Sequence, residues 1–253
     1  MNPTKLNFPT CEKSQLDELN TLFKQWYASA KNKKFIKEKS SEDLVFDGFY
    51  PFFSKQKVKV LFIGRESLGL TGDHYLDMLH WLYKSGENIG KKSLNQSQFH
   101  ALKLKVSYGL NNGSCPWEEI PSAESISQSF AEENGVSFAF MNLSKLSNDS
   151  ESWKADWELI DSFTDEFKDE DINFFNKEIE IINPDVIITM NLEGRLANLG
   201  ELEVLEYGSD VSCFKLTCGS KQILLMDTYH FSAVKKQQDT FYTPIIESFK
   251  KYS

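Results

Sequence analysis

Wholly apolar runs alternate along the chain with stretches in which apolar residues recur every three or four positions. The first pattern is typical of strands buried on both faces, and the second of amphipathic helices. Strands are expected at 58–63, 136–143, 185–190, 204–207, 211–216 and 222–227. Helices are expected at 14–38, 73–84, 96–107, 117–132, 151–168, 171–182, 193–200 and 235–251. Gly48 and Pro51 interrupt the aromatic segment 46–53, which predicts a turn or loop there.

Buried strands separated by helices indicate an α/β fold in which helices cover both faces of the sheet. We expect a three-layer α/β/α sandwich around a mainly parallel sheet of about four to five strands. The length of 253 residues suits one domain. We therefore expect a single domain over 1–253, with an N-terminal helical extension over about 1–53.

Charge is unevenly distributed along the sequence. The 28 Lys and Arg residues and the 37 Asp and Glu residues give a formal net charge of −9. Segment 151–185 holds twelve acidic and three basic residues, so it alone accounts for that charge. Such a segment is typical of a solvated helical face. An acidic protein is an unusual nucleic-acid binder, but the remainder of this chain is neutral.

The sequence shows neither a secretory signal nor an apolar run long enough to cross a bilayer. We therefore expect a cytoplasmic protein with reduced thiols and no membrane partner. The cysteines form no CxxC pair and lack zinc-finger spacing with histidine; they are Cys11, Cys115, Cys213 and Cys218. A four-cysteine iron–sulfur site would need close ligand pairs, so buried or incidental thiols, with no metal and no cofactor, are expected.

Polar side chains follow the ends of the expected strands. Glu66 follows the strand at 58–63, and Asn142 comes at the end of the strand at 136–143. Asn191 follows the strand at 185–190, and His230 follows the strand at 222–227. Because the carboxyl ends of parallel strands meet at one edge of a sheet, we expect these groups to share a site. Each residue alone also has an ordinary structural interpretation, as a helix cap, turn residue or buried histidine.

Together, these side chains fit the cleavage of a bond between a sugar and a nucleobase. An Asn side chain can read a base edge through a donor and an acceptor. A carboxylate can orient water or stabilise an oxocarbenium-like sugar. A histidine can hydrogen-bond the departing base as it becomes negatively charged. The pattern therefore predicts an N-glycosidic hydrolase that needs no metal.

Five short motifs resemble the uracil-DNA glycosylase superfamily in their order and spacing. The segment VLFIGRESLG at 60–69 resembles the family's strand followed by Gly-Gln-Asp-Pro-Tyr or Gly-Glu-Ala-Pro-Gly. TGDHY at 71–75 resembles Thr/Gln-Gly-x-Pro-Phe, and FMNLSK at 140–145 resembles a strand ending in Thr-Asn-x-x-Lys. PDVIITM at 184–190 and HFS at 230–232 resemble the family's later strand and its His-Pro-Ser motif. The resemblance covers roughly 58–251 and implies a uracil-DNA glycosylase-like fold.

The resemblance implies a monofunctional DNA glycosylase that acts on a base flipped out of DNA. Glu66 would orient water or stabilise the sugar cation, and His230 would stabilise the departing base. Asn142 would read the base and Tyr75 would stack on it. Arg65 and Leu68 would also line the base site. The base-binding candidates are therefore Asn142, Tyr75, Arg65 and Leu68.

The sequence departs from the family's motifs at several of these positions. Glu66 has one methylene more than the family's Asp, and Arg65 replaces a Gln or Glu. Leu68 stands where one branch has a Tyr that excludes the thymine methyl, and Phe231 replaces the Pro after the histidine. These differences predict a base pocket of different shape. The substrate base is therefore expected to be uracil, a damaged base or a modified base, in a repair or a defence role.

DNA would be held mainly through its phosphates, as a single or double strand. The candidate phosphate-binding residues are Ser67, Ser232, Lys235 and Lys236, with Lys91, Lys92 and Lys145 as further candidates. The helix expected to begin just after His230 would direct its N-terminal amides at a phosphate. A wedge near Phe231 or Ala233 would fill the gap left by the base. We expect a monomer.

Two alternatives remain open from the sequence. The fold can be a nucleic-acid or nucleotide-binding module that no longer cleaves, as the imperfect first motif and the net acidity indicate. The chain can instead act on a free nucleoside. Turnover on an oligonucleotide would exclude the first alternative, and activity on a nucleoside alone would select the second.

Overall fold

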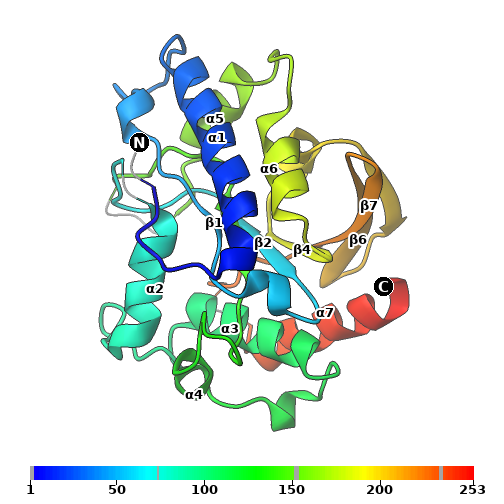
Figure 1. The fold of residues 1–253 in the computed structure, drawn as a ribbon. Helices are drawn as coiled ribbons and strands as arrows, with labels where there is room; N and C mark the ends of the chain where they lie inside the picture. The colour runs from blue at the N-terminus through cyan, green and yellow to red at the C-terminus, as the bar shows by residue number, and fades with distance from the viewer. Residues whose placement is uncertain (1–2, 73, 151–153, 234–235) are drawn as a thin grey trace.

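The computed structural model of the chain describes residues 3–72, 74–150, 154–233 and 236–253. Within these residues, seven strands form one sheet in the order β1-β3-β2-β4-β7-β6-β5 (Figure 1). The strands are β1 (Gly48–Phe49), β2 (Val60–Gly64), β3 (Ala139–Asn142), β4 (Val186–Met190), β5 (Leu202–Glu206), β6 (Val211–Cys218) and β7 (Lys221–Thr228). The expected α/β class is therefore confirmed.

The sheet is mixed, and it is larger than the sequence predicted. The neighbouring strands β3, β2, β4 and β7 are parallel, whereas β1, β6 and β5 each pair antiparallel with their neighbours. The expectation of a mainly parallel sheet of about four to five strands is therefore wrong. Helices separate β2, β3 and β4 along the chain, but β5, β6 and β7 follow one another through short connections, which favour antiparallel pairing.

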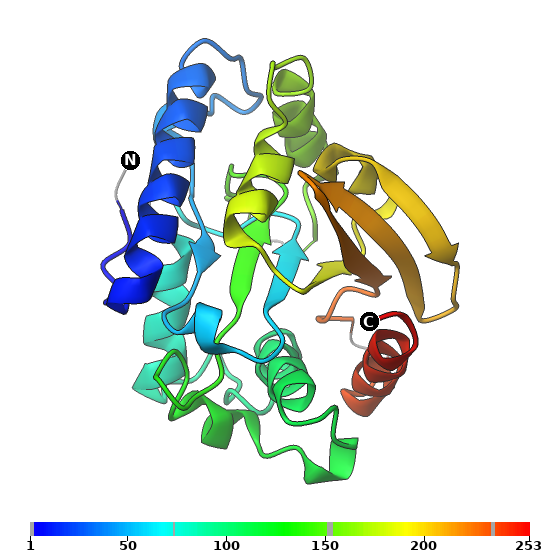
Figure 2. The same ribbon diagram turned by 45° about the vertical axis from the view of Figure 1, so that its right-hand side comes forward.

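Helices pack against both faces of this sheet. The helices on one face are α1 (Lys13–Ala30), α5 (Trp157–Glu166) and α6 (Phe174–Ile182). Those on the other face are α2 (Tyr75–Ser85), α3 (Gln98–Asn111), α4 (Ala123–Ser127) and α7 (Asp239–Tyr252). Figure 2 shows α1 and α6 side by side, with α3 and α7 beside each other across the sheet. Alternation along β2 explains both cores: Leu61 and Ile63 face α1, whereas Val60 and Phe62 face α3.

The N-terminal segment is part of this packing. Trp26 of α1 is fully buried and stacks on Phe174 of α6, with ring centroids 5.0 Å apart. The segment 46–53 contributes β1 instead of forming only a turn, because Gly48 and Phe49 pair with Phe140 and Ala139 at the start of β3. A Cβ atom at Gly48 would lie 2.7 Å from Leu19 Cδ2, so the absence of a side chain lets α1 pack closely here.

Several helices are shorter than their periodicity predicted. The segment 117–132 forms only a 3-10 turn at Trp117–Glu119 and the short helix α4, because Pro121 interrupts it and Ser122 caps α4. The segment 193–200 is a 3-10 helix over Glu193–Leu199. The last helix, α7, begins at Asp239 and not just after His230, so its N-terminal amides do not adjoin the histidine.

Candidate active site at the carboxyl edge of the sheet

The ends of the four parallel strands lie side by side, as the sequence predicted. Gly64 at the end of β2 pairs with Asn142 at the end of β3. Met190 at the end of β4 pairs with Thr228 at the end of β7. The segments that follow these strands therefore share one edge of the sheet, which we call the carboxyl edge.

Asn142 lies below the surface of this edge and is 2% exposed. Its backbone N–H donates a hydrogen bond to Asp47 Oδ2 at 2.7 Å, which fixes the end of β3. A Cβ atom added to Gly64 would lie 2.8 Å from Asn142 Oδ1 and 2.9 Å from Phe140 Cζ, so glycine is needed there. Among the described residues, the side-chain amide of Asn142 has no hydrogen-bond partner. Its donor and acceptor are therefore free for a ligand.

Three aromatic side chains connect Asn142 with His230, and we call them the aromatic wall: Tyr75, Phe140 and Phe99. Tyr75 begins α2 and stacks on Phe140, with ring centroids 4.8 Å apart and planes inclined by 22°. The Phe99 centroid lies 6.3 Å from that of Phe140. His230 stacks on Phe99 at 5.5 Å and 12°. The amide, the wall and the imidazole thus belong to one site on the α3 side of the sheet.

His230 is held as a neutral imidazole of defined orientation. Its Nδ1 accepts the backbone N–H of Ser232 at 3.3 Å and lies 2.6 Å from Ser232 Oγ. Burial lowers the pKa of His230 to about 3, and the positive charge of Arg65 contributes in the same direction. Because Nδ1 accepts a backbone N–H, the single proton of the neutral ring lies on Nε2. His230 therefore presents an N–H donor. Ser232, a candidate phosphate-binding residue, is exposed and positions this ring through its backbone N–H and its hydroxyl.

The loop that carries His230 is fixed from both sides. Gln98 Nε2 of α3 donates to the carbonyl oxygens of Phe231 at 2.7 Å and Ala233 at 3.2 Å. Phe231 is fully buried, and its ring centroid lies 6.0 Å from that of Phe62. Phe231 is a core residue that anchors the loop, so its suggested role as a wedge in DNA is wrong.

Glu66 is half-buried and turns toward the loop before α5. Its Oε1 accepts the backbone N–H of Asp156 at 2.9 Å and Nδ2 of Asn148 at 3.4 Å. Burial raises the pKa of Glu66, and these hydrogen bonds oppose that effect. Within the described part of the chain, no hydrogen bond joins Glu66 to Asn142 or His230, and Oε2 has no hydrogen-bond partner. The structure thus brings the amide and the imidazole onto one aromatic wall, but it does not place Glu66 against that wall.

Asp227 is an acidic residue at this edge that the sequence interpretation did not assign. It lies opposite Thr189 in the sheet and accepts a hydrogen bond from Thr189 Oγ1 at 2.6 Å. Burial raises the pKa of Asp227, whereas the charge of Arg65 is among the effects that lower it. Its position at the end of an apolar strand was the available sequence signal. Asp227 therefore offers a second carboxyl group for the chemistry of the edge.

Arg65 is close enough to the acidic residues and to His230 to act on them electrostatically. Its Nε and Nη2 each donate to the Asn191 carbonyl oxygen at 3.2 Å. Its guanidinium lies over the Trp157 ring, 4.7 Å from the centroid. Burial lowers the pKa of Arg65, and neighbouring carboxylates such as Asp227 oppose this. Because Arg65 acts electrostatically on both Asp227 and His230, it contributes a fixed positive charge to the site.

The candidate DNA-contacting residues are divided between the surface and the interior. Ser67 is 3% exposed, and its hydroxyl has no hydrogen-bond partner in the described regions, so it does not face solvent where a phosphate would lie. Lys145 is fully buried in an ion-pair network and cannot reach DNA. Lys236 is ion-paired with Asp210 and lies 4.0 Å from the Tyr229 ring centroid. Lys91, Lys92 and Leu68 are exposed, whereas Lys235 lies outside the described residues.

A buried lysine adjoins the aromatic wall and was not singled out from the sequence. Lys103 of α3 is fully buried, with Nζ 4.1 Å from the Phe99 centroid and 4.4 Å from the Phe140 centroid. In the described chain, Nζ has no hydrogen-bond partner. Burial lowers the pKa of Lys103 well below its ordinary value. The helical spacing of Phe99, Lys103 and Val106, which puts the lysine on an apolar face, was the signal that could have identified it.

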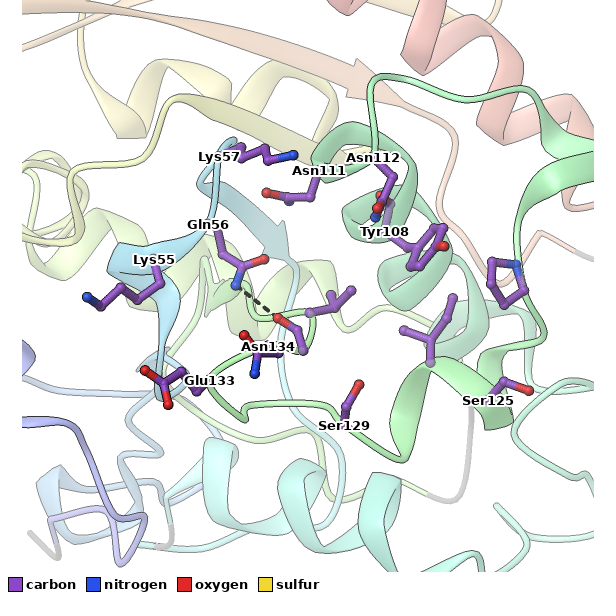
Figure 3. A pocket seen from close by; sticks show the side chains of 14 residues that line it. Lys55, Gln56, Lys57, Tyr108, Asn111, Asn112, Ser125, Ser129, Glu133 and Asn134 are labelled. Atoms are coloured by element: carbon purple, nitrogen blue, oxygen red, sulfur yellow. Dashed lines mark hydrogen bonds between the residues drawn. The ribbon is translucent and has the colours of Figure 1, made fainter.

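Two surface cavities lie away from the carboxyl edge. One, of about 390 Å³, lies near the start of β2 and the end of α3, and its lining includes Lys55, Gln56, Asn111 and Asn134 (Figure 3). The other, of about 550 Å³, lies between α1 and α6. Because Asn142 and Tyr75 are only 2% and 7% exposed, a ligand would reach them only if the side chains that cover them moved.

The described regions contain no group of three or more His, Cys, Asp and Glu side chains placed to hold a metal ion. The four thiols are free, and Cys213 and Cys218 are buried. No helix in these regions is both long and apolar enough to cross a membrane.

No family model, curated protein or solved structure matches this chain. The residues and geometry of the carboxyl edge are therefore the basis on which a function can be proposed.

Proposed function

We propose that the protein is a DNA glycosylase with a three-layer, uracil-DNA glycosylase-like fold. It would hydrolyse the N-glycosidic bond of a flipped-out uracil, damaged base or modified base in DNA. One observation carries this proposal. The side-chain amide of Asn142, which has no partner among the described residues, and the neutral imidazole of His230 lie along the same aromatic wall. That set of groups suits a planar ligand that has polar edges and leaves as an anion.

Base recognition is assigned to Asn142 and the aromatic wall. The amide would pair with a donor and an acceptor on the base edge. Aromatic faces would contact the planar ring, with Tyr75 as the stacking partner. One face of Tyr75 already packs on Phe140, so the base would use another face or displace that contact. Since the target must leave the base stack, a mismatched or modified base would be extracted more readily.

Departure of the base is assigned to His230. Its Nε2–H would donate to a base oxygen or nitrogen as negative charge develops there. The neutral ring suits this role because its Nε2–H can hydrogen-bond the departing base without giving up the proton. Arg65 adds positive charge nearby, which would further stabilise the anionic base.

The carboxylate step has two candidates at this edge. We retain Glu66 as the group that orients water or stabilises the sugar cation, since its Oε2 is not engaged by the described residues. Asp227 is the competing candidate because it lies on the sheet beside Thr189 and near Arg65. Comparison of Glu66→Gln with Asp227→Asn in single-turnover base release decides between them: the larger loss identifies the working carboxylate.

The test is an abasic-site assay on single- and double-stranded oligonucleotides. These carry uracil, hypoxanthine, oxidised pyrimidines or hypermodified cytosines. At least one substrate should yield abasic product, and Asn142→Ala and His230→Ala should each lower the rate by about 10²–10⁴-fold. Asn112→Ala is the matched control, because Asn112 is an exposed amide beside the cavity at the opposite edge (Figure 3). Absence of abasic product on every substrate, or full activity in both site variants, would overturn the proposal.

A binding module without turnover is the second candidate, and the position of Glu66 favours it. Its Oε1 is engaged in holding the loop before α5, as expected for a structural residue. Fluorescence anisotropy with the same oligonucleotides separates the two functions. Salt-sensitive binding without any base release selects the module, whereas release of any base selects the glycosylase.

A further inference from the structure

Lys103 is a buried amine without the partners that normally accompany buried charge. It is fully buried within α3, and no described residue accepts a hydrogen bond from Nζ. Its surroundings are the rings of Phe99, Phe140 and Phe138, with Nζ at 4.1, 4.4 and 6.0 Å from their centroids. A buried ammonium group is unfavourable without a paired charge or hydrogen-bond acceptors. The environment therefore favours the neutral amine, which is the nucleophilic form of lysine.

The amine lies next to the candidate active site. The Phe99 ring contacts both Lys103 and His230, whose ring stacks on it at 5.5 Å. Phe140, the other ring against Nζ, lies on β3 two residues before Asn142. The α3 helix also holds the His230 loop through Gln98. Lys103 is thus built into the same wall that would receive an extruded nucleotide.

We propose that Lys103 is a Schiff-base nucleophile for an aldehyde, and that its ligand is the ring-opened deoxyribose of an abasic site. The identity of this aldehyde rests on the proposed function, because a glycosylase generates an abasic sugar at this edge. The presence of a lysine nucleophile departs from the expectation of a monofunctional enzyme.

The chemistry needs no oxidant or reductant. The Lys103 Nζ lone pair attacks C1′ of the aldehyde, and the carbonyl oxygen leaves as water with both amine protons, so that an imine remains. Once the imine is protonated, the C2′ proton passes to solvent water, and the 3′ phosphate leaves with the electron pair of its C3′–O bond. Water then hydrolyses the imine and restores the amine. The expected outcome is cleavage of the strand on the 3′ side of the abasic sugar.

Access to the amine depends on Phe99. This ring is partly buried and separates Lys103 from His230. An extruded sugar that takes the place of the Phe99–His230 stack would displace the ring and expose Nζ. Phe99→Ala should therefore increase the rate at which Lys103 reacts with a small aldehyde.

The test uses the full-length protein and DNA that already contains an abasic site. Sodium borohydride reduces an imine to a stable secondary amine, so a covalent protein–DNA adduct reports Schiff-base formation. We expect an adduct with the wild-type protein, located at Lys103 by mass spectrometry of the digested conjugate. Lys103→Met should lower the adduct yield at least about tenfold, whereas Lys105→Met should not. Lys105 is the matched control because it lies on the same helix and has Gln238 as a hydrogen-bond partner at 2.9 Å.

The outcomes separate this inference from the proposed function. An adduct at Lys103 supports the nucleophile even if no modified base is ever released, because the abasic site is supplied ready-made. Base release without any adduct overturns the nucleophile and leaves the glycosylase standing. An adduct at another lysine or at the N-terminus also overturns it. Location of the adduct in the wild-type protein decides the matter even if Lys103→Met fails to fold.

Discussion

Lys145 and Lys103 are both fully buried lysines, but their surroundings differ completely. Lys145 Nζ lies 2.5 Å from Asp47 Oδ1 and 2.9 Å from Glu178 Oε2. Burial lowers the pKa of Lys145, but its interactions with these two carboxyl groups raise it above its ordinary value overall. Lys103 lies among aromatic rings, and burial lowers its pKa well below the ordinary value. The partners, and not the depth of burial, therefore determine the charge of a buried lysine.

The difference also separates a structural role from a chemical one. Asp47 accepts hydrogen bonds from Lys145 through Oδ1 and from the Asn142 backbone through Oδ2. The charged network is therefore joined directly to the end of β3 and positions the candidate base-reading residue. Lys103 has no such engagement in the described chain, which leaves its amine free to react.

The largest expected effect comes from removing the amine of Lys145 from its buried ion pairs. Lys145→Met leaves two carboxyl groups buried without their cation, and it should lower the free energy of unfolding by about 3–5 kcal/mol. Glu178→Gln is the matched control. Burial raises the pKa of Glu178 well above its ordinary value and so favours its neutral form, which leaves the charge of Lys145 balanced by Asp47. The neutral amide of Glu178→Gln keeps this balance. Urea titration of both variants tests this. A Lys145→Met variant as stable as the wild type would show that the ion pair does not hold the fold.

A smaller effect should follow from disturbing Asn142 without touching the ion pairs. In Gly64→Ala, the new Cβ would approach Asn142 Oδ1 to 2.8 Å and Phe140 Cζ to 2.9 Å unless these atoms shift. Overpacking of this kind lowers stability by about 1–3 kcal/mol. We also expect base release to fall by more than the folded fraction does, because the base-reading amide is displaced. Single-turnover rates, corrected for the folded fraction, measure this. An unchanged rate would show that the position of Asn142 is unimportant.

Replacement of the unpaired Lys103 should change the free energy of unfolding in the opposite direction from replacement of the paired Lys145. Lys103→Met replaces an amine without a partner by an apolar side chain of similar length. We expect unfolding stability to stay the same or rise by about 1 kcal/mol, because an unsatisfied polar group is removed from the interior. Thermal and urea unfolding beside Lys145→Met test the contrast directly. A loss as large as that of Lys145→Met would mean that Lys103 has an essential structural partner.

The sequence predicted the carboxyl edge but not the contacts across it. Strands such as 185–190 are apolar throughout and end at polar residues, so their shared edge followed from the rules for parallel sheets. The hydrogen bond between Glu66 and Asp156 joins residues separated by 90 positions, and no local pattern specifies it. A lysine on an apolar helix face can also extend its amine to solvent. The burial of Lys103 depends on rings such as Phe138 that come from distant segments.

The last expected effect is confined to acidic pH and concerns the charge of His230, the ring that shares Phe99 with Lys103. The pKa of His230 falls from the ordinary 6.5 to about 3 in the folded protein, so the unfolded chain binds this proton more readily. The neutral imidazole of His230 therefore contributes fully to the stability of the fold above pH 6.5, and this contribution is lost as the pH falls toward 3. His230→Gln should therefore lose less stability than the wild type between these values, as measured by urea unfolding at a series of pH values. Parallel curves for the two proteins would mean that His230 is protonated normally in the fold. It would then be mainly a cation only below about pH 6.5, and the neutral N–H donor of the proposed base departure would be a minority form there.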